Sequence, residues 1–251
     1  MLSSRKRYKK DKQERIKMLL ETLQPIIAEG FMIADNIKDH HKIIDVRYLG
    51  ENTFVIRLER KNKEFVPGQH IQLQIPGNPK YREYSIYSGL NDNFIEVLVK
   101  EVTEGYLTPM LKKRKQGDFL EMRGPMGHFR LKSADIETKK FLFIGSGTGI
   151  SPFHGFVKSY PTLNYSILHG VRYGFEAYDR DHYPAEKIVV CTSGDENGNF
   201  HGRVTDYLKA HEISKNTLVY LCGNYNMIVE SMEILKSQGF SREQLFVESY
   251  F

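Results

Sequence analysis

Residues 141–152 have the sequence FLFIGSGTGISP, an apolar run followed by three glycines in five positions and then a proline that permits a helix to start. Glycines at such a turn bring backbone N–H groups and the helix N-terminus close to a phosphate. The segment departs from the dinucleotide fingerprint, because Ile150 replaces the third glycine, and it lacks the lysine of a nucleotide-triphosphate loop. It predicts a strand, a tight turn and a helix, with or without a bound phosphate.

The sequence around this stretch alternates buried apolar runs with helical segments. We expect strands at residues 141–144, 166–169, 188–191, 218–222 and 245–247, and helices at residues 152–159, 204–210 and 226–237. Continuous apolar strands that alternate with helices predict a parallel sheet covered on both faces. Ligands bind such sheets beyond the carboxyl ends of the strands.

The preceding hundred residues have a different pattern, with short strands in which apolar and polar residues alternate. Phe54, Ile56 and Leu58 are one example of this period of two. We expect strands at residues 43–48, 53–59, 70–75, 83–87, 94–102 and 118–122, and one helical stretch at residues 107–114. Six such strands, separated by glycine and proline, predict a small closed antiparallel β-barrel.

Length and composition favour two domains in a globular protein. The chain has 251 residues, of which 40% are hydrophobic and 27% are charged. Its two cysteines, Cys191 and Cys222, cannot form a disulfide framework or the four-thiolate set of an iron–sulfur cluster. We therefore expect no metal site and a reducing, cytoplasmic location.

The positive charge is concentrated at one end of the chain. Residues 1–17 contain eight basic residues against Asp11 and Glu14, a net of +6, so the remainder is near −1 although the whole chain carries +5. We expect residues 1–40 to form a basic, partly helical extension. A solvated helix is the simpler interpretation, and a nucleic-acid or membrane-surface binding module is the alternative. We expect no nucleic-acid partner, no membrane span and no signal peptide.

Four further motifs are ordinary when taken singly. Arg-Glu-Tyr-Ser at residues 82–85 and Gly-Tyr-Leu-Thr at residues 105–108 are compatible with an exposed strand and a turn. The same holds for Gly-Pro-Met-Gly-His-Phe at residues 124–129 and Cys-Gly-Asn at residues 222–224. The terminal Glu-Ser-Tyr-Phe at residues 248–251 is less ordinary, because chain ends are usually polar.

The order and spacing of these motifs resemble those of the ferredoxin-NADP reductase superfamily, and most closely the bacterial ferredoxin/flavodoxin-NADP reductases. The resemblance covers residues 41–251. It implies an antiparallel β-barrel FAD-binding domain at residues 41–137, followed by an α/β parallel-sheet domain for NADP(H) at residues 138–251. The resemblance alone leaves open whether FAD or FMN occupies the barrel.

The resemblance assigns FAD contacts to two motifs of the barrel. Arg82 would hold the pyrophosphate, Tyr84 would pack on the isoalloxazine ring, and Ser85 would hydrogen-bond near its reactive N5 atom. The second motif would supply another phosphate contact through Gly105, Tyr106, Leu107 and Thr108.

The resemblance also implies roles in the second domain. Gly147, Thr148 and Gly149 would cradle the pyrophosphate of the nicotinamide nucleotide. Cys222 and Glu248 would position the nicotinamide ring, and Tyr250 would cover the flavin face that this ring must reach. Phe251 replaces the tryptophan that many bacterial members place last. Core packing alone is the alternative for the terminal pair, and a small buried hydrophobe is the alternative for Cys222.

One departure from the family bears on nucleotide choice. Ser193 matches a family serine, but Gly194 stands where many members have the arginine that meets the 2′-phosphate of NADPH. Arg172 and Arg203 match other basic contacts. We expect NADPH to remain preferred, with a relaxed preference.

The resemblance implies a reductase that takes a hydride from NADPH onto FAD and passes single electrons to ferredoxin or flavodoxin. Its proposed catalytic residues are Ser85, Cys222, Glu248 and Tyr250. The alternative within the superfamily is an NADH-dependent reductase component of an oxygenase, or a free-flavin reductase.

Overall fold

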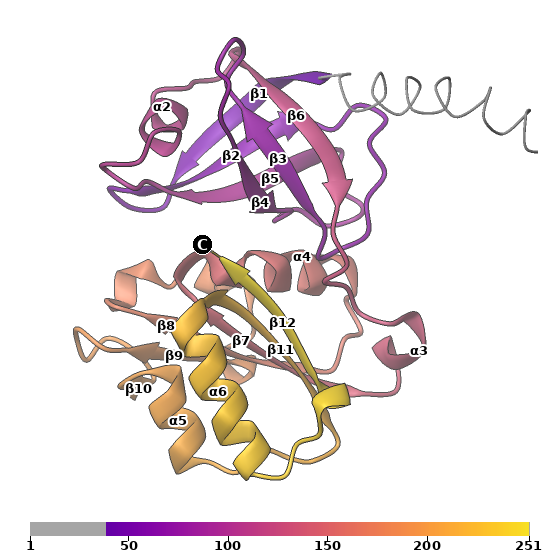
Figure 1. Cartoon of the computed structure of the whole chain (residues 1–251), viewed down its shortest axis with the longest axis vertical. Coiled ribbons are helices and arrows are strands. Elements are labelled where there is room, and N and C mark those ends of the chain that lie inside the picture. Colours follow the sequence, from indigo (N-terminus) through magenta and orange to yellow (C-terminus); the bar gives the residue numbers. More distant parts are fainter. Residues whose placement is uncertain (1–38, 251) are drawn as a thin grey trace, which may run out of the picture. The chain divides into compact units, whose positions relative to one another are not determined.

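The computed structural model describes residues 39–250, which contain two six-stranded sheets (Figure 1). The first sheet is formed by strands β1 (Asp39–Tyr48), β2 (Thr53–Glu59), β3 (His70–Gln74), β4 (Tyr81–Ser85), β5 (Phe94–Lys100) and β6 (Phe119–Met126). Its strand order is β4-β3-β6-β1-β2-β5. An antiparallel bridge between Ile86 and Val97 joins its two edges and closes the barrel. The predicted closed antiparallel barrel is confirmed.

Alternation along the strands fills the inside of the barrel. Phe54, Ile56 and Leu58 on β2 are fully buried, and Phe54 lies opposite Val99 of β5 in the antiparallel register. Helix α2 (Thr108–Lys112) packs on the barrel through Leu111, which is also fully buried.

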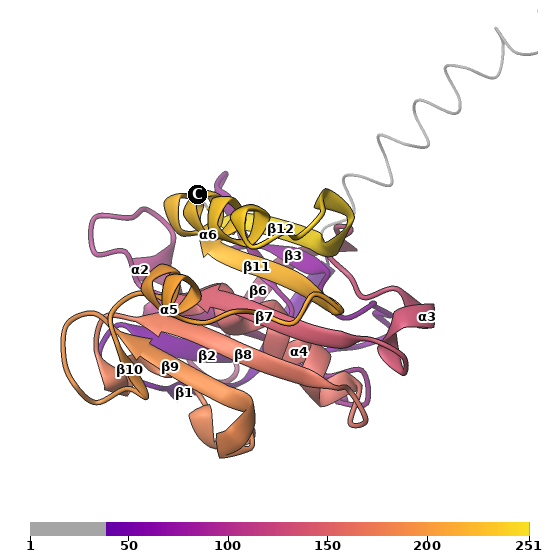
Figure 2. The same ribbon diagram turned by 90° about the horizontal axis from the view of Figure 1, so that it is seen from below.

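The second sheet is parallel and lies after the barrel in the chain (Figure 2). It contains β7 (Lys140–Ser146), β8 (Tyr165–Val171), β9 (Ile188–Thr192), β10 (Phe200–His201), β11 (Thr217–Asn224) and β12 (Leu245–Tyr250). The strand order is β10-β9-β8-β7-β11-β12. The order reverses between β7 and β11, which is where open α/β sheets bind ligands.

Helices cover both faces of this sheet, as the continuous apolar strands predicted. Leu142 and Ile144 of β7 pack into the cluster formed with α5 (Val204–Ala210) and α6 (Tyr225–Ser237). Phe141 and Phe143 point to the opposite face, where α4 (Ser151–Ser159) supplies further aromatic rings. Figure 2 shows α5 and α6 together on one face of the sheet and α4 on the other.

Helix α4 also lies in close contact with the barrel. A Cβ atom on Gly155 would lie 2.9 Å from the backbone oxygen of Ile86, so a larger residue there would push α4 away from the barrel. The Ser159 hydroxyl adds a hydrogen bond from the Leu90 N–H at 3.0 Å. These contacts hold the two sheets at close range.

The expected elements are all present, with small differences at their ends. The glycine and proline at residues 124–125 do not end β6, which continues to Met126. Short elements without a clear periodicity were not predicted, among them α3 (Ser133–Ile136) and β10. Residues 1–38 of the basic segment expected at residues 1–40 lie outside the described residues. Within residues 39–250, no helix has the length and apolar character needed to cross a bilayer.

Candidate functional site

A cavity of about 760 Å³ lies at the carboxyl ends of the parallel strands. Its walls include Gly147 after β7, Gly170 of β8, Cys191 of β9 and Gly223 of β11. The cavity therefore lies at the point where the strand order reverses. Of the residues predicted to bind the nucleotide, Gly147, Thr148, Arg172, Ser193, Arg203 and Tyr250 line it.

The loop after β7 presents an open glycine to this cavity. Gly147 has φ +53°, and a Cβ atom there would meet nothing within 4 Å. The buried His169 side chain lies behind the loop, with Nε2 2.8 Å from the Gly147 carbonyl oxygen. Since a carbonyl only accepts, Nε2 carries the proton, and burial lowers the pKa of His169 to about 4, so this ring is neutral. The histidine thus fixes the turn without placing a charge beneath it.

Gly149 lies away from the cavity, in contact with β11. A Cβ atom there would lie 2.3 Å from the Cys222 backbone oxygen. The N–H of Asn224 donates to Ser146 Oγ at 3.0 Å, and the Asn224 side chain accepts from two N–H groups at the start of α6. The geometry explains this glycine by close packing of the loop on β11.

The basic residues predicted to choose the nucleotide border the same cavity. A Cβ atom on Gly194 would lie 2.8 Å from the Arg172 backbone oxygen and 3.0 Å from Arg172 Cγ. The side chain of Arg172 thus runs past the position where many family members have their arginine. Arg203 lies at the start of α5 and also lines the cavity.

The barrel contributes one residue to the cavity wall. Lys100, at the end of β5, lines the cavity and pairs with Glu176 at 2.7 Å. The other carboxylate oxygen of Glu176 accepts the N–H groups of Arg172 and Tyr173 at 3.1 and 3.2 Å. Burial alone would raise the pKa of Glu176, but these partners outweigh it and lower the pKa.

Four residues predicted to be catalytic meet where the two sheets adjoin. Ser85 at the end of β4 donates to Glu248 Oε2 at 3.1 Å, and its hydroxyl lies 2.7 Å from Tyr250 Oη. Cys222 of β11 is fully buried and lies opposite Glu248 in the parallel register of β11 and β12. The structure therefore brings together Ser85, Cys222, Glu248 and Tyr250, which are up to 165 positions apart in the sequence.

Protonation in this cluster is governed by burial. Desolvation raises the pKa of Glu248 to about 7, opposed by the hydrogen bond from Ser85 and assisted by the charge of Glu83. Burial raises the pKa of the Cys222 thiol well above its ordinary value, with Glu248 adding to the effect. Near neutral pH the thiol keeps its proton, whereas Glu248 can both hold and release one. Glu248 is the member of the cluster able to transfer a proton at that pH.

The barrel strand that precedes this cluster carries groups that fit a flavin. The Tyr84 hydroxyl is buried and has no partner among residues 39–250. A buried hydroxyl without a partner is costly, so a ligand atom there would satisfy it. Arg82 is exposed. Among the described residues, its guanidinium hydrogen-bonds to the carbonyl oxygen of the adjacent Tyr81, at 2.9 Å. Its guanidinium is therefore available to an anion.

The second barrel motif is built mainly as a turn. The Thr108 hydroxyl accepts the Val102 N–H at 2.9 Å, and a Cβ atom on Gly105 would lie 2.8 Å from the Val102 oxygen. Leu107 is buried in the barrel core. Tyr106 is the member of the motif with a largely exposed ring, 47% accessible, and Lys80 Nζ lies 4.1 Å from its centroid.

Sequence patterns did not identify every residue of the site. Lys100, Glu176 and Asn226 line the cavity, yet each lies outside the motifs discussed above. Lys100 is the last residue of β5, Glu176 ends the turn after β8, and Asn226 lies in the first turn of α6. Periodicity does not specify that these three positions meet at one cavity. Asn224 stood within the Cys-Gly-Asn motif, and its helix-capping role was a usable signal. The predicted Phe251 lies outside the described residues.

Comparisons with known proteins agree with this architecture. A family model described as the oxidoreductase FAD-binding domain matches residues 42–131. The electron transfer component of toluate 1,2-dioxygenase from Pseudomonas putida is 24% identical over 225 residues, which cover 83% of this chain and 66% of that protein. A probable dihydroorotate dehydrogenase B (NAD(+)) electron transfer subunit from Pyrococcus furiosus is 33% identical over 193 residues, 76% of this chain and 72% of that one.

A solved structure shows the same fold over both sheets. The ferredoxin NADP+ reductase from Neisseria gonorrhoeae, with bound FAD and NADP, superposes with a TM-score of 0.77 at 18% identity, covering 85% of this chain and 99% of that one. The chain spans 57 to 66% of the length of the first oxygenase reductase relatives that it matches.

Proposed function

Because the chain belongs to the ferredoxin-NADP reductase superfamily of FAD-binding oxidoreductases, we propose that it oxidises NADPH and passes the electrons singly to ferredoxin or flavodoxin. The observation that carries this proposal is the contact that Tyr250 makes between the cavity of the parallel-sheet domain and the barrel. Tyr250 lines the large cavity and is hydrogen-bonded to Ser85 on the barrel strand that carries Arg82 and Tyr84. A nucleotide in the cavity and a flavin on the barrel would therefore meet at Tyr250.

Bound FAD would accept a hydride from the nicotinamide and release its two electrons one at a time. The chain's own residues would orient the two ligands and handle the proton. Arg82 and the Tyr84 hydroxyl would hold the flavin, and Gly147 with Thr148 would hold the nucleotide's pyrophosphate. Tyr250 would have to leave the ring face before the nicotinamide could stack there.

Glu248 and Ser85 would supply the proton path at this position. The carboxyl group, with its pKa near 7, can exchange a proton through the Ser85 hydroxyl 3.1 Å away. Cys222 would shape the pocket as a neutral thiol, because its raised pKa keeps it protonated.

An anaerobic absorbance titration tests the proposal directly. The purified protein should be yellow, and NADPH should bleach it at lower concentration than NADH does. The protein reduced in this titration should then reoxidise on mixing with ferredoxin or flavodoxin. A protein that cannot be loaded with FAD, or that neither nucleotide bleaches, would contradict it.

An NADH-dependent reductase component of an oxygenase is the second candidate, and Gly194 is the observation that favours it. This position lacks the arginine that many superfamily members direct at the 2′-phosphate of NADPH. The Arg172 side chain passes close to Gly194. Arg172 would therefore have to supply the positive charge that binds the 2′-phosphate.

Replacing the two cavity arginines separates the candidates. A charge-assisted hydrogen bond contributes about 1.5–3 kcal/mol, so Arg172→Ala and Arg203→Ala should each weaken NADPH binding by roughly 10- to 100-fold. NADH binding should change little. Arg180→Ala is the control, since Arg180 does not line the cavity. Equal losses for both nucleotides would favour the NADH-dependent candidate.

A further inference from the structure

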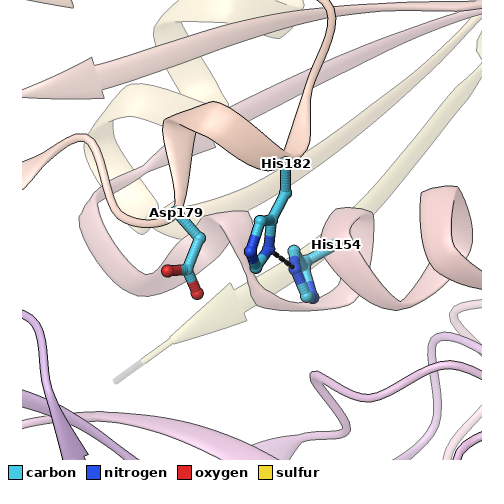
Figure 3. A group of neighbouring side chains, drawn as sticks. All are labelled: His154, Asp179 and His182. Carbon is cyan, nitrogen blue, oxygen red and sulfur yellow. Dashed lines mark hydrogen bonds between the residues drawn. The ribbon is translucent and has the colours of Figure 1, made fainter.

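Two histidines and an aspartate form a cluster that the proposed function does not use. His154 belongs to α4, Asp179 directly precedes the short 3-10 turn Arg180–His182, and His182 is the last residue of that turn. One possible ligand atom from each residue lies within 4.8 Å of the others (Figure 3). None of the three lines the large cavity. We propose that this cluster binds one divalent transition-metal ion, with Zn²⁺ as the best match.

His154 is oriented in the way that metal-ligating histidines usually are. Its ring is buried and stacks on Tyr87 with a centroid distance of 3.7 Å. Its Nδ1 lies 2.6 Å from the Tyr87 carbonyl oxygen, so Nδ1 carries the proton and Nε2 has a free lone pair. A backbone carbonyl on the remote nitrogen fixes the tautomer and raises the basicity of the other. That other nitrogen faces His182 Nδ1 at 2.9 Å, which Figure 3 marks with a dashed line.

The carboxylate of Asp179 is held by residues from the barrel. Its Oδ1 accepts Arg47 Nη1 at 2.6 Å, and its Oδ2 accepts Arg47 Nη2 at 2.8 Å and the Tyr87 hydroxyl at 2.9 Å. Each carboxylate oxygen can accept two bonds, so Oδ1 keeps one lone pair. Ligating carboxylates are ordinarily hydrogen-bonded by such outer partners.

Donor type selects the ion. Two imidazole nitrogens and one carboxylate oxygen suit Zn²⁺, which leaves a fourth tetrahedral position for water, whereas Mg²⁺ and Ca²⁺ prefer oxygen ligands alone. A Zn–N distance of about 2.0 Å gives ligand separations of about 3.3 Å in a tetrahedron. The histidine nitrogens are already near that spacing, and His182 is exposed. The sequence pattern did not indicate this metal site. His154, Asp179 and His182 are separated by 25 and 3 positions, which matches no common spacing of metal ligands.

A bound ion would join α4 to the loop that follows β8. Both elements contact the barrel through Arg47 and Tyr87, so the ion would stiffen the junction between the sheets. The competing arrangement is a simple hydrogen bond between the two histidines, which needs neither a metal nor Asp179.

Titration of the flavin-loaded protein with ZnCl₂ after dialysis against a chelator tests the proposal. Competition with a chromogenic chelator should reveal one equivalent of Zn²⁺. Co²⁺ should give the absorption of a tetrahedral site at wavelengths beyond the flavin bands. Residues 1–38 contain no histidine or cysteine, so they offer no imidazole or thiolate site of their own.

Three variants decide which residues bind. His182→Asn and Asp179→Asn should each weaken Zn²⁺ binding at least tenfold, with flavin content unchanged. His201→Asn is the matched control, an exposed histidine 3.2 Å from Glu196, and it should bind as the unmodified chain does. The proposal is overturned if no stoichiometric binding occurs, if His182→Asn or Asp179→Asn binds normally, or if all three variants lose the ion equally.

Discussion

At the scale of single residues, Ser85, Glu248 and Tyr250 form a chain of hydroxyl and carboxyl groups across the junction of the two sheets. The resemblance named these residues, and β4 and β12, whose ends differ from the predicted ones by two and three residues, place them together. The pKa of Glu248 was not predictable from the sequence, because it depends on burial between β12 and the barrel. The residue type alone does not reveal how far the fold removes a carboxyl group from water.

Replacing Tyr250 by serine should tighten nucleotide binding. The ring lines the cavity and must be displaced by the nicotinamide in the proposed function. An aromatic stacking contact contributes about 0.5–1.5 kcal/mol, so its loss should lower the Kd for NADP+ by roughly 2- to 12-fold. Difference spectroscopy of the flavin-loaded protein measures this. Unchanged affinity together with an unchanged rate of flavin reduction would contradict the displacement.

Replacing Glu248 by glutamine should change how stability depends on pH. The folded chain holds this proton up to about pH 7, whereas an unperturbed carboxyl group with a pKa of 4.5 releases it earlier. Stability contributed by the neutral form therefore falls as pH rises from about 4.5 to 7, by at most about 3 kcal/mol. Glu248→Gln should lack this fall in urea unfolding, while Glu51→Gln, at an exposed turn, should retain it. Parallel curves for Glu248→Gln and the unmodified chain would show that the shift is absent.

At the scale of elements, the loop between β7 and α4 shows what a glycine pattern leaves undecided. The sequence predicted the strand, the turn and the helix in the right order. The resemblance assigned Gly147 and Gly149 one shared role, whereas the geometry opens Gly147 to the cavity and packs Gly149 on β11. This difference arises from the parallel pairing of β7 with β11, a contact between segments 77 positions apart, as in the pair Leu142 and Val219.

Alanine at position 149 should therefore destabilise the fold. Its Cβ would lie 2.3 Å from a backbone oxygen of β11, which cannot turn aside as a flexible side chain can. Overpacking of this kind costs about 1–3 kcal/mol. Gly50→Ala is the control, because a Cβ atom there meets nothing within 4 Å, and it should change stability by less than about 0.5 kcal/mol. Equal urea midpoints for the two variants would refute the close approach.

At the scale of the whole molecule, ion pairs connect the barrel to the segment after β8. Arg47 pairs with Asp179, and Lys100 pairs with Glu176. Sequence analysis predicted both sheets but neither of these pairs, since their partners are 132 and 76 positions apart, respectively. The hydrophobic pattern specifies which face of an element is buried, and it does not specify which charges meet at the rim.

Replacing Asp179 by asparagine should weaken the junction. Asparagine tolerates the left-handed backbone at this position, φ +49°, so the charge is lost with the turn retained. The Asp179 side chain is 7% exposed and that of Arg47 is 38%, so the cost should lie between the surface and buried limits, about 2 kcal/mol. Because the Asp179 pKa is lowered, this contribution is present above about pH 4 and is lost as the pH falls further.

Unfolding in the presence of a chelator measures the Asp179 effect without any contribution from metal. Glu230→Gln is the control, since its pair with Lys209 is exposed on both sides, and it should cost less than about 1 kcal/mol. A cost for Asp179→Asn no larger than that of the control would mean that the junction does not depend on this pair.

The shared carboxylate of Glu176 has a consequence for the energetics of ligand binding. It holds Lys100 of the barrel with one oxygen and two N–H groups beside the nucleotide cavity with the other. A ligand that shifts Arg172 or Tyr173 must therefore alter the environment of the barrel lysine. In the proposed function, binding of a nucleotide in the cavity and of flavin on the barrel would therefore be thermodynamically linked, and the linkage would be reciprocal. The factor by which a nucleotide would lower the dissociation constant of flavin equals the factor by which flavin would lower that of the nucleotide, and Glu176→Gln should bring both factors towards one.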